Sequence, residues 1–135
     1  GYVMTCCRLT SQHSMEHALS AFHPELPHGA GLIMLSLAYF GHMIKTGART
    51  ERFVELARAL GHRDAVRPED FLRALHELQI ACGVADLKMS DWGITREEIP
   101  ALAENCRSAG ALLFEQDPVA LTFEDTVAIY EAAYR

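Results

Sequence analysis

Apolar residues recur at spacings of three and four along almost the whole chain, which is the pattern of amphipathic helices. Strand signals are nearly absent, because no run alternates apolar and polar residues over a useful length. The pattern predicts helices over residues 2–22, 28–47, 51–60, 68–78 and 96–106, a short one at 109–114, and a last one at 123–134. The sequence therefore predicts an all-α fold, and we expect residues 1–135 to form a single compact multi-helix domain.

Residues that commonly begin or end helices stand at these boundaries. Pro24 and Pro27 separate the first two helices, since proline interrupts helical hydrogen bonding. Thr95 and Glu98 have the spacing of a capping box, in which side chains satisfy free backbone amides. The other signals are Thr50 and Gly61 around the third helix, Pro68 in the first turn of the fourth, and Thr122 with Asp125 at the last. Residues 82–93 are left as a predicted loop or partial turn.

Composition and charge exclude several classes of function. The chain has 135 residues and a net charge of −6, which gives no electrostatic support for binding nucleic acid. Its longest apolar stretch, residues 30–40, is shorter than the ~20 residues that a membrane span needs. The cysteines form no CxxC pair and predict buried free thiols in a reducing cytosol: Cys6, Cys7, Cys82 and Cys106. We therefore expect a cytoplasmic protein that binds neither nucleic acid nor membrane.

The first ten residues, GYVMTCCRLT, begin inside an apolar pattern, with no initiator Met and no signal-peptide pattern. We interpret the chain as a piece of a longer protein, cut inside or just before a helix. Such a piece is expected to expose apolar surface between Tyr2 and Phe22, which favours self-association. A homo-oligomer is the predicted state.

Four of the seven histidines lie within residues 11–29: His13, His17, His23 and His28. His13 and His17 are four apart on a predicted helix and so share one face. His28 follows a proline-containing turn at the start of the next helix, and a helix hairpin brings it back beside the pair. Pro27 stiffens this turn, and Gly29 lets a ligand approach closely. Imidazoles in this arrangement are suited to hold a metal or to move a proton near neutral pH, whereas we expect His23 on the loop surface, outside the site.

Two other interpretations of the same histidines remain open. In the first, the chain is a free-standing helical binding or assembly module whose histidines are structural or bind a regulatory metal. In the second, the segment His13-Ser14-Met15-Glu16-His17 is the H-x-x-E-H zinc signature of inverted zincin peptidases. Glu16 is then the residue that activates water, and Glu97 or Glu98 the third ligand. Short motifs match by chance, and such peptidases have sheets that this sequence does not predict.

The histidine segment resembles the metal-binding signature of the iron-containing (group III) alcohol dehydrogenases. In that family a His is followed four residues later by a second His, and then by Pro-His-Gly at the start of the next helix. Here the pattern is His13, His17 and Pro27-His28-Gly29. The resemblance continues through ERFVELARALG and through the closing stretch from VADLKMSDWGITREE to the LTFED cap and the final AAY, so that it covers essentially the whole chain.

The resemblance implies an NAD(P)-dependent alcohol dehydrogenase or aldehyde reductase, of which this chain is the helical C-terminal domain. In this family an Asp and three His hold Fe²⁺, or Zn²⁺ or another divalent ion, in a cleft against an N-terminal nucleotide-binding domain. By position, His13 and His28 are implied as metal ligands. His17 is implied as the non-ligand histidine near the nicotinamide and the alcohol or aldehyde substrate, where it transfers a proton. The remaining Asp and His belong to a helix upstream of this signature, and the chain alone is expected to be inactive.

Three departures from the family pattern stand out. The spacing from His17 to His28 is one residue longer, and the extra residue falls in the turn, where insertions are absorbed easily. The family often has Asn-Pro-Arg where this chain has Asp117-Pro118-Val119, so any role of that arginine is absent here. Leu113 and Phe114 fall where the family's substrate pocket closes, which makes an apolar pocket one expectation and plain core packing the other.

Overall fold

The computed structural model describes residues 7–135, and these residues contain helices and no strand. The all-α prediction is therefore confirmed for the described part of the chain. The α-helices are α2 (Ser11–Phe22), α3 (His28–Lys45), α4 (Thr50–Ala59), α5 (Glu69–Ala81), α6 (Ile99–Ala109), α7 (Ala111–Phe114) and α8 (Phe123–Ala133). Two short 3-10 helices, η1 (Met89–Trp92) and η2 (Arg96–Glu98), precede α6.

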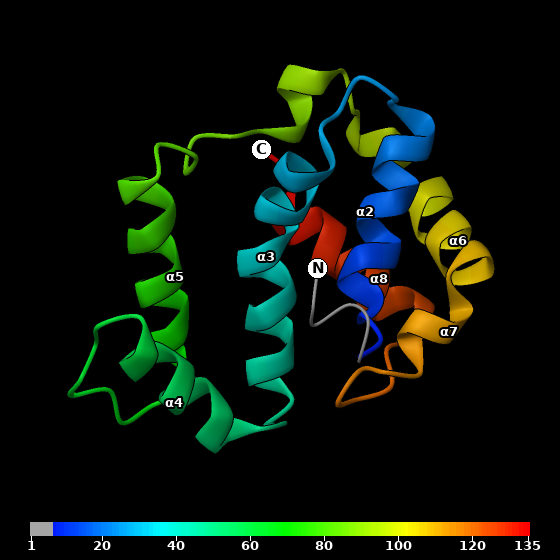
Figure 1. The fold of residues 1–135 in the computed structure, drawn as a ribbon. Coiled ribbons are helices and arrows are strands. Elements are labelled where there is room, and N and C mark those ends of the chain that lie inside the picture. Colours follow the sequence, from blue (N-terminus) through cyan, green and yellow to red (C-terminus); the bar gives the residue numbers. More distant parts are fainter. Residues whose placement is uncertain (1–6) are drawn as a thin grey trace.

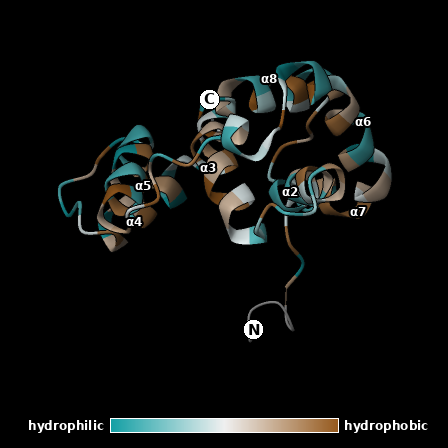
Figure 2. Cartoon of the chain, turned by 90° about the horizontal axis from the view of Figure 1, so that it is seen from above, coloured by the Kyte–Doolittle hydropathy of each residue, from teal (hydrophilic) through white to brown (hydrophobic). Residues whose placement is uncertain are grey.

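The helices form a main bundle with a smaller helical hairpin beside it (Figure 1). Helix α2 packs against α3, α6 and α7, while α8 packs against α3 and α6. Helices α4 and α5 pack against each other, and α5 joins them to α3. Figure 2 shows α4 and α5 set to one side of α3, with α2, α6, α7 and α8 on its other side. Helix α3 is thus shared by both parts.

The first described helix begins at Ser11, so the prediction of a helix from Tyr2 is wrong for residues 7–10, and residues 1–6 lie outside the described part. Thr10 is extended at the N-cap position, with φ −91° and ψ 175°. The backbone amide of Ser11 donates to Oδ1 of Asp117 at 3.0 Å. The hydroxyl of Tyr39 donates to the same oxygen at 2.6 Å. A distant carboxylate therefore satisfies the free amide at the start of α2, which local sequence pattern does not reveal.

The other helix boundaries follow the predicted capping residues closely. Thr122 and Asp125 form the predicted capping box at α8. Thr95 and Glu98 also form their capping box, although the chain first makes the 3-10 turn η2 before α6. Helix α4 begins at Thr50 itself, because Arg49 takes the N-cap position with a left-handed φ of 56°. The predicted loop at 82–93 contains η1, whose Met89 is fully buried.

Several expectations about burial are corrected by the structure. Cys106 is buried, but Cys7 and Cys82 are exposed, and Cys6 lies outside the described residues. The described part of the first helix buries its apolar face in the core and exposes one large apolar side chain, Phe22. A large exposed apolar surface on this helix, which was the reason to expect self-association, is thus not present in its described part. No helix among residues 7–135 combines the length and the hydropathy needed to cross a bilayer.

Candidate metal centre

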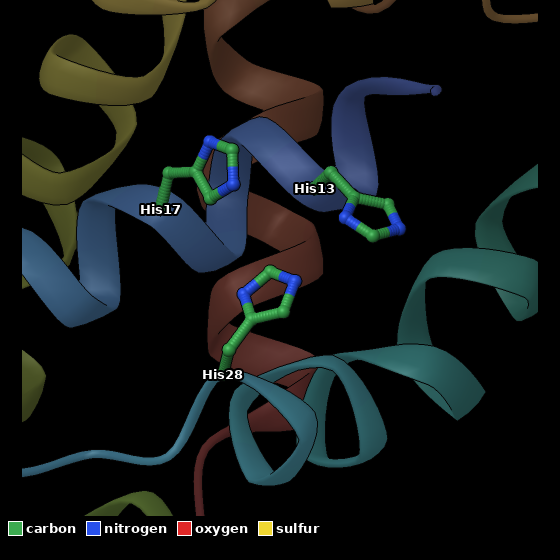
Figure 3. Close-up of side chains that lie close together, drawn as sticks. All are labelled: His13, His17 and His28. Carbon is green, nitrogen blue, oxygen red and sulfur yellow. The ribbon is translucent and has the colours of Figure 1, made fainter. Parts of the chain in front are cut away.

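The three histidines His13, His17 and His28 converge where α2 meets the start of α3 (Figure 3). Each offers one ring nitrogen, and these nitrogens lie within 4.8 Å of one another. The ring centroids are 5.3 Å apart for His13 and His28, 5.4 Å for His17 and His28, and 6.3 Å for His13 and His17. The hairpin that the sequence predicts therefore brings the i,i+4 pair and the residue after Pro27 to one place.

The three rings differ in their exposure. His17 and His28 are exposed, whereas His13 is half-buried. Nδ1 of His13 is inaccessible to solvent and has no hydrogen-bond partner in the described structure. Burial lowers the pKa of His13, and the neighbouring His28 and His17 lower it further, against a smaller opposing effect of Glu16. A lowered pKa favours the neutral imidazole, which is the form that binds metals.

Glu16 lies beside this cluster and is fully buried. Its Oε2 is hydrogen-bonded to Nδ1 of His28. Its Oε1 accepts from the hydroxyl of Ser20 at 2.5 Å. Sequence reasoning considered Glu16 only as the base of a zinc peptidase and missed this contact, which joins residues 12 positions apart across the turn.

The contacts of Glu16 also bear on the peptidase interpretation. A general base in such an enzyme must reach the water that it activates. Glu16 has no solvent-accessible surface, and both of its oxygens are engaged within the protein. Glu98, one of the two suggested third ligands, is instead hydrogen-bonded to His23 at 3.1 Å and to the backbone amide of Thr95 at 2.6 Å. The geometry therefore does not support a peptidase.

The other histidines lie outside the cluster. His23 ends α2 and is bonded to Glu98, so it joins the turn to α6 rather than lying free on the surface. Nε2 of His42 lies 3.5 Å from Asp125 on α8. Nε2 of His62 lies 2.8 Å from Oε2 of Glu77. His42 and His62 are thus each next to a carboxylate, and His76 is exposed.

Two of the residues that depart from the family pattern, Asp117 and Phe114, make defined contacts within the fold. Asp117 anchors the start of α2 through Ser11, as described above. Phe114 packs against the core, with the guanidinium carbon of Arg107 5.0 Å from its ring centre, which matches the packing alternative.

An apolar cavity of about 370 Å³ lies instead between α3 and α5, and its lining includes Gln12, Leu32, Ile33, Leu75 and Leu78.

Residues 1–134 match the family described as "Fe-containing alcohol dehydrogenase family, C-terminal". The chain belongs to this family. It is 28% identical over 125 residues to the long-chain primary alcohol dehydrogenase AdhA of Thermoanaerobacter ethanolicus, a match that covers 90% of this chain and 31% of that protein. The resemblance inferred from the histidine signature is thus confirmed across the chain.

Solved structures of alcohol dehydrogenases share the fold. The archaeal halo-thermophilic Red Sea brine pool enzyme ADH/D1 superposes with a TM-score of 0.83 at 26% identity, over 92% of this chain and 32% of that one. The alcohol dehydrogenase from Oenococcus oeni gives a TM-score of 0.75 at 31% identity, over 95% of this chain and 33% of that one. The chain spans about a third of the length of the relatives it matches.

Proposed function

We propose that this chain forms the metal-binding wall of the active site in an NAD(P)-dependent alcohol dehydrogenase or aldehyde reductase. The observation that carries the proposal is the convergence of three imidazoles at the junction of α2 and α3, in a chain of the Fe-containing alcohol dehydrogenase family. In this proposal His13 and His28 are metal ligands, an Asp and a His on an upstream helix complete the ligand set, and a preceding domain binds the nicotinamide.

The residues present fit a divalent transition metal. Imidazole nitrogens suit Fe²⁺ and Zn²⁺. The buried Nδ1 of His13 has no partner in the described structure, and buried polar groups are normally paired. Gly29 adds no bulk beside His28, since a Cβ placed there meets no atom within 4 Å. The cluster thus has suitable donors, and Gly29 beside His28 faces open space.

Each histidine has a distinct part in the proposed reaction. When bound, the metal supplies Lewis-acid polarisation of the substrate oxygen. The nicotinamide supplies the hydride chemistry. His13 and His28 would hold the metal from α2 and α3, two helices that pack against each other. His17 is exposed, faces the same space and is proposed to move the proton of the hydroxyl group.

The proposal is tested on the full-length protein that carries this chain. We expect about one Fe²⁺ or Zn²⁺ per chain, and reduction of aliphatic aldehydes with NADH or NADPH that stops when a chelator removes the metal. The relative AdhA is named for long-chain primary alcohols, so these and their aldehydes are the first substrates to test. Full activity in metal-free protein contradicts the proposal.

Residues 1–135 alone are proposed to be inactive, because two histidine ligands hold a metal weakly and the nucleotide-binding domain is separate. Purified residues 1–135 mixed with metal, NAD(P)H and aldehyde should show no turnover above the rate without protein. Turnover by this piece would show that the site is complete within it.

A further inference from the structure

We propose that Glu16 is a positioning residue for the metal centre, acting through His28. It accepts the Nδ1 hydrogen of His28 and so leaves Nε2 as the lone-pair nitrogen that binds the metal. This inference rests on the proposed metal site, and it assigns Glu16 a part in metal binding rather than in fold stability alone.

The first step is the hydrogen bond itself. Nδ1 of His28 lies against Oε2 of Glu16. A carboxylate accepts hydrogen bonds, so in the proposed arrangement the imidazole hydrogen is on Nδ1 and the lone pair on Nε2 is left for the metal. The side chain of His28 is 50% exposed, whereas that of Glu16 is 0% exposed. Glu16 thus holds a surface ring from its buried side and fixes both its tautomer and its orientation.

The second step is that the protein is built around this carboxyl group. Ser20, one turn along α2, donates its hydroxyl to Oε1 of Glu16. Gly31 of α3 leaves room for the side chain, because a Cβ at that position would lie 2.7 Å from Cγ of Glu16. Ser20 on α2 and Gly31 on α3 therefore place Glu16 where it meets His28.

The third step is the cost of burying a charge. A carboxylate removed from water is strongly unfavourable unless it is paired and hydrogen-bonded. Within the described residues, the hydrogen-bond partners of Glu16 are Ser20 and His28. No lysine or arginine among these residues forms an ion pair with Glu16. His28 is thus the residue through which Glu16 would be compensated, and a metal cation held by His28 would supply positive charge there while the imidazole stays neutral.

The consequence for the metal is stronger binding. A carboxylate that accepts from the non-ligating nitrogen of a metal-bound histidine fixes the orientation of the ring and makes the ligating nitrogen more basic. Removing such a partner typically weakens metal binding by about 10–100-fold. A purely structural Glu16 has a different signature, since its loss destabilises the fold without changing the affinity of the protein that remains folded.

The experiment compares the full-length protein with its Glu16→Gln variant, which keeps the shape of the side chain and removes its charge. Co²⁺ is the probe, because its visible absorption reports the ligands directly and chelator competition gives its dissociation constant. We expect Glu16→Gln to weaken Co²⁺ binding by about 10–100-fold and to shift the Co²⁺ spectrum. The thermal midpoint of the metal-free form should not fall. Unchanged affinity and an unchanged spectrum overturn the proposal.

Glu98→Gln is the matched control. Glu98 is also a glutamate bonded to a histidine, His23, but that pair lies outside the cluster. Glutamine is compatible with the capping box that Glu98 forms, so the fold tolerates the change. We expect Co²⁺ affinity and spectrum to match the parent protein. An equal loss of affinity in both variants contradicts a specific effect at His28.

A second variant, Ser20→Ala, keeps the proposal testable if Glu16→Gln folds poorly. Ser20→Ala removes only the hydroxyl that holds Oε1 of Glu16, and Ser20 lies in a partly exposed position. It should weaken Co²⁺ binding in the same direction but by less than Glu16→Gln, and parent-like affinity counts against the proposal. If the parent protein binds no Co²⁺, the proposed function itself fails, whereas binding that is insensitive to Glu16 and Ser20 removes this inference alone.

Discussion

Two pairs of consecutive helices, α4–α5 and α2–α3, differ in the contacts that they bury. The α4–α5 pair meets α3 through aromatic rings: the centroid of Phe71 lies 5.5 Å from that of Phe53 and 5.3 Å from that of Phe40. The α2–α3 pair also buries apolar residues, but it buries Ser11, Ser14, Glu16 and Ser36 as well. Helix packing does not require these polar groups. The α4–α5 pair buries polar groups too, Asp70 and Gln79. Glu16 differs from the others because it contacts the histidine cluster through His28, so we infer that α2 and α3 are arranged for chemistry as well as for packing.

The largest expected effect is on the stability of the α4–α5 pair. Phe71 is 6% exposed and contacts two other aromatic rings. Phe71→Ala should lower the free energy of unfolding of α4 and α5 by about 3–5 kcal/mol, since it removes a large buried side chain and leaves a cavity. Hydrogen exchange of their backbone amides measures this loss, and metal affinity should stay within about twofold.

Leu78→Ala on the same helix is the control for this prediction. Leu78 is the last residue of the helix that the sequence predicts over 68–78, and it is 44% exposed. Its replacement should change stability by no more than about 0.5 kcal/mol. If Phe71→Ala lowers the free energy of metal binding as much as it lowers the free energy of unfolding of α4 and α5, the two regions are not independent.

The next effect is on metal binding and belongs to the α2–α3 pair. His28→Ala should weaken binding of Fe²⁺ or Zn²⁺ to the full-length protein by more than about 100-fold. Loss of a residue that only hydrogen-bonds to a metal ligand typically costs about 10–100-fold, and loss of the ligand itself should cost more. A 100-fold loss corresponds to about 2.7 kcal/mol. Chelator competition gives the value.

His62→Ala is the control for this prediction, because it removes a histidine beside the α4–α5 pair. His62 follows α4 and is bonded to Glu77, away from the cluster. Metal affinity should be that of the parent protein. Equal affinity in His28→Ala and His62→Ala would place the metal site elsewhere.

Two glycines of α3 differ in their surroundings: Gly31 faces the side chain of Glu16, whereas Gly29 faces open space. Gly31→Ala places a Cβ against Glu16 and should lower the free energy of unfolding by about 1–3 kcal/mol, as overpacking does. Gly29→Ala, two residues earlier, meets no atom within 4 Å and should raise stability by up to about 1 kcal/mol, because alanine favours a helix. Chemical denaturation of the two variants measures the contrast. Equal effects of the two substitutions would contradict the close fit between Gly31 and Glu16.

The sequence predicts the parts of the fold that depend on local pattern. Helical periodicity and the capping residues Thr122 and Asp125 locate helix ends within a few residues, because these signals act over one or two turns. The histidines at 13, 17 and 28 could be grouped because their spacing and the intervening prolines imply a hairpin. The partner of Asp117 could not be found in this way, since its contact with Ser11 spans 106 positions.

Glu16 shows a different limit of sequence reasoning. It lies on α2 next to Met15, at the edge of the apolar face that points into the core. A glutamate at such an edge is ordinarily solvated, and its burial depends on Gly31 of the following helix. The signal that could have indicated it is the combination of a small residue in α3 with a hydroxyl at Ser20, one turn further along α2. Neither residue indicates a partner for Glu16 when it is read alone.

The smallest expected effect is a pH dependence confined to the α4–α5 pair. Oδ2 of Asp70 accepts from the backbone amides of Val66 and Arg67, each at 3.0 Å. The bond from the Arg67 amide, and next the bond from the Val66 amide, lower the pKa of Asp70. A carboxyl group whose pKa is lower in the folded state stabilises the fold at neutral pH. This contribution is lost as the pH falls below about 4, where the unfolded carboxyl takes up its proton first.

Asp70→Asn should therefore be less stable than the parent at pH 7, and the difference should shrink towards pH 3. Urea denaturation across this range measures it, with Asp86→Asn at an exposed position as the control. A difference that does not change with pH would mean that the hydrogen bonds, and not the charge, make Asp70 stabilising.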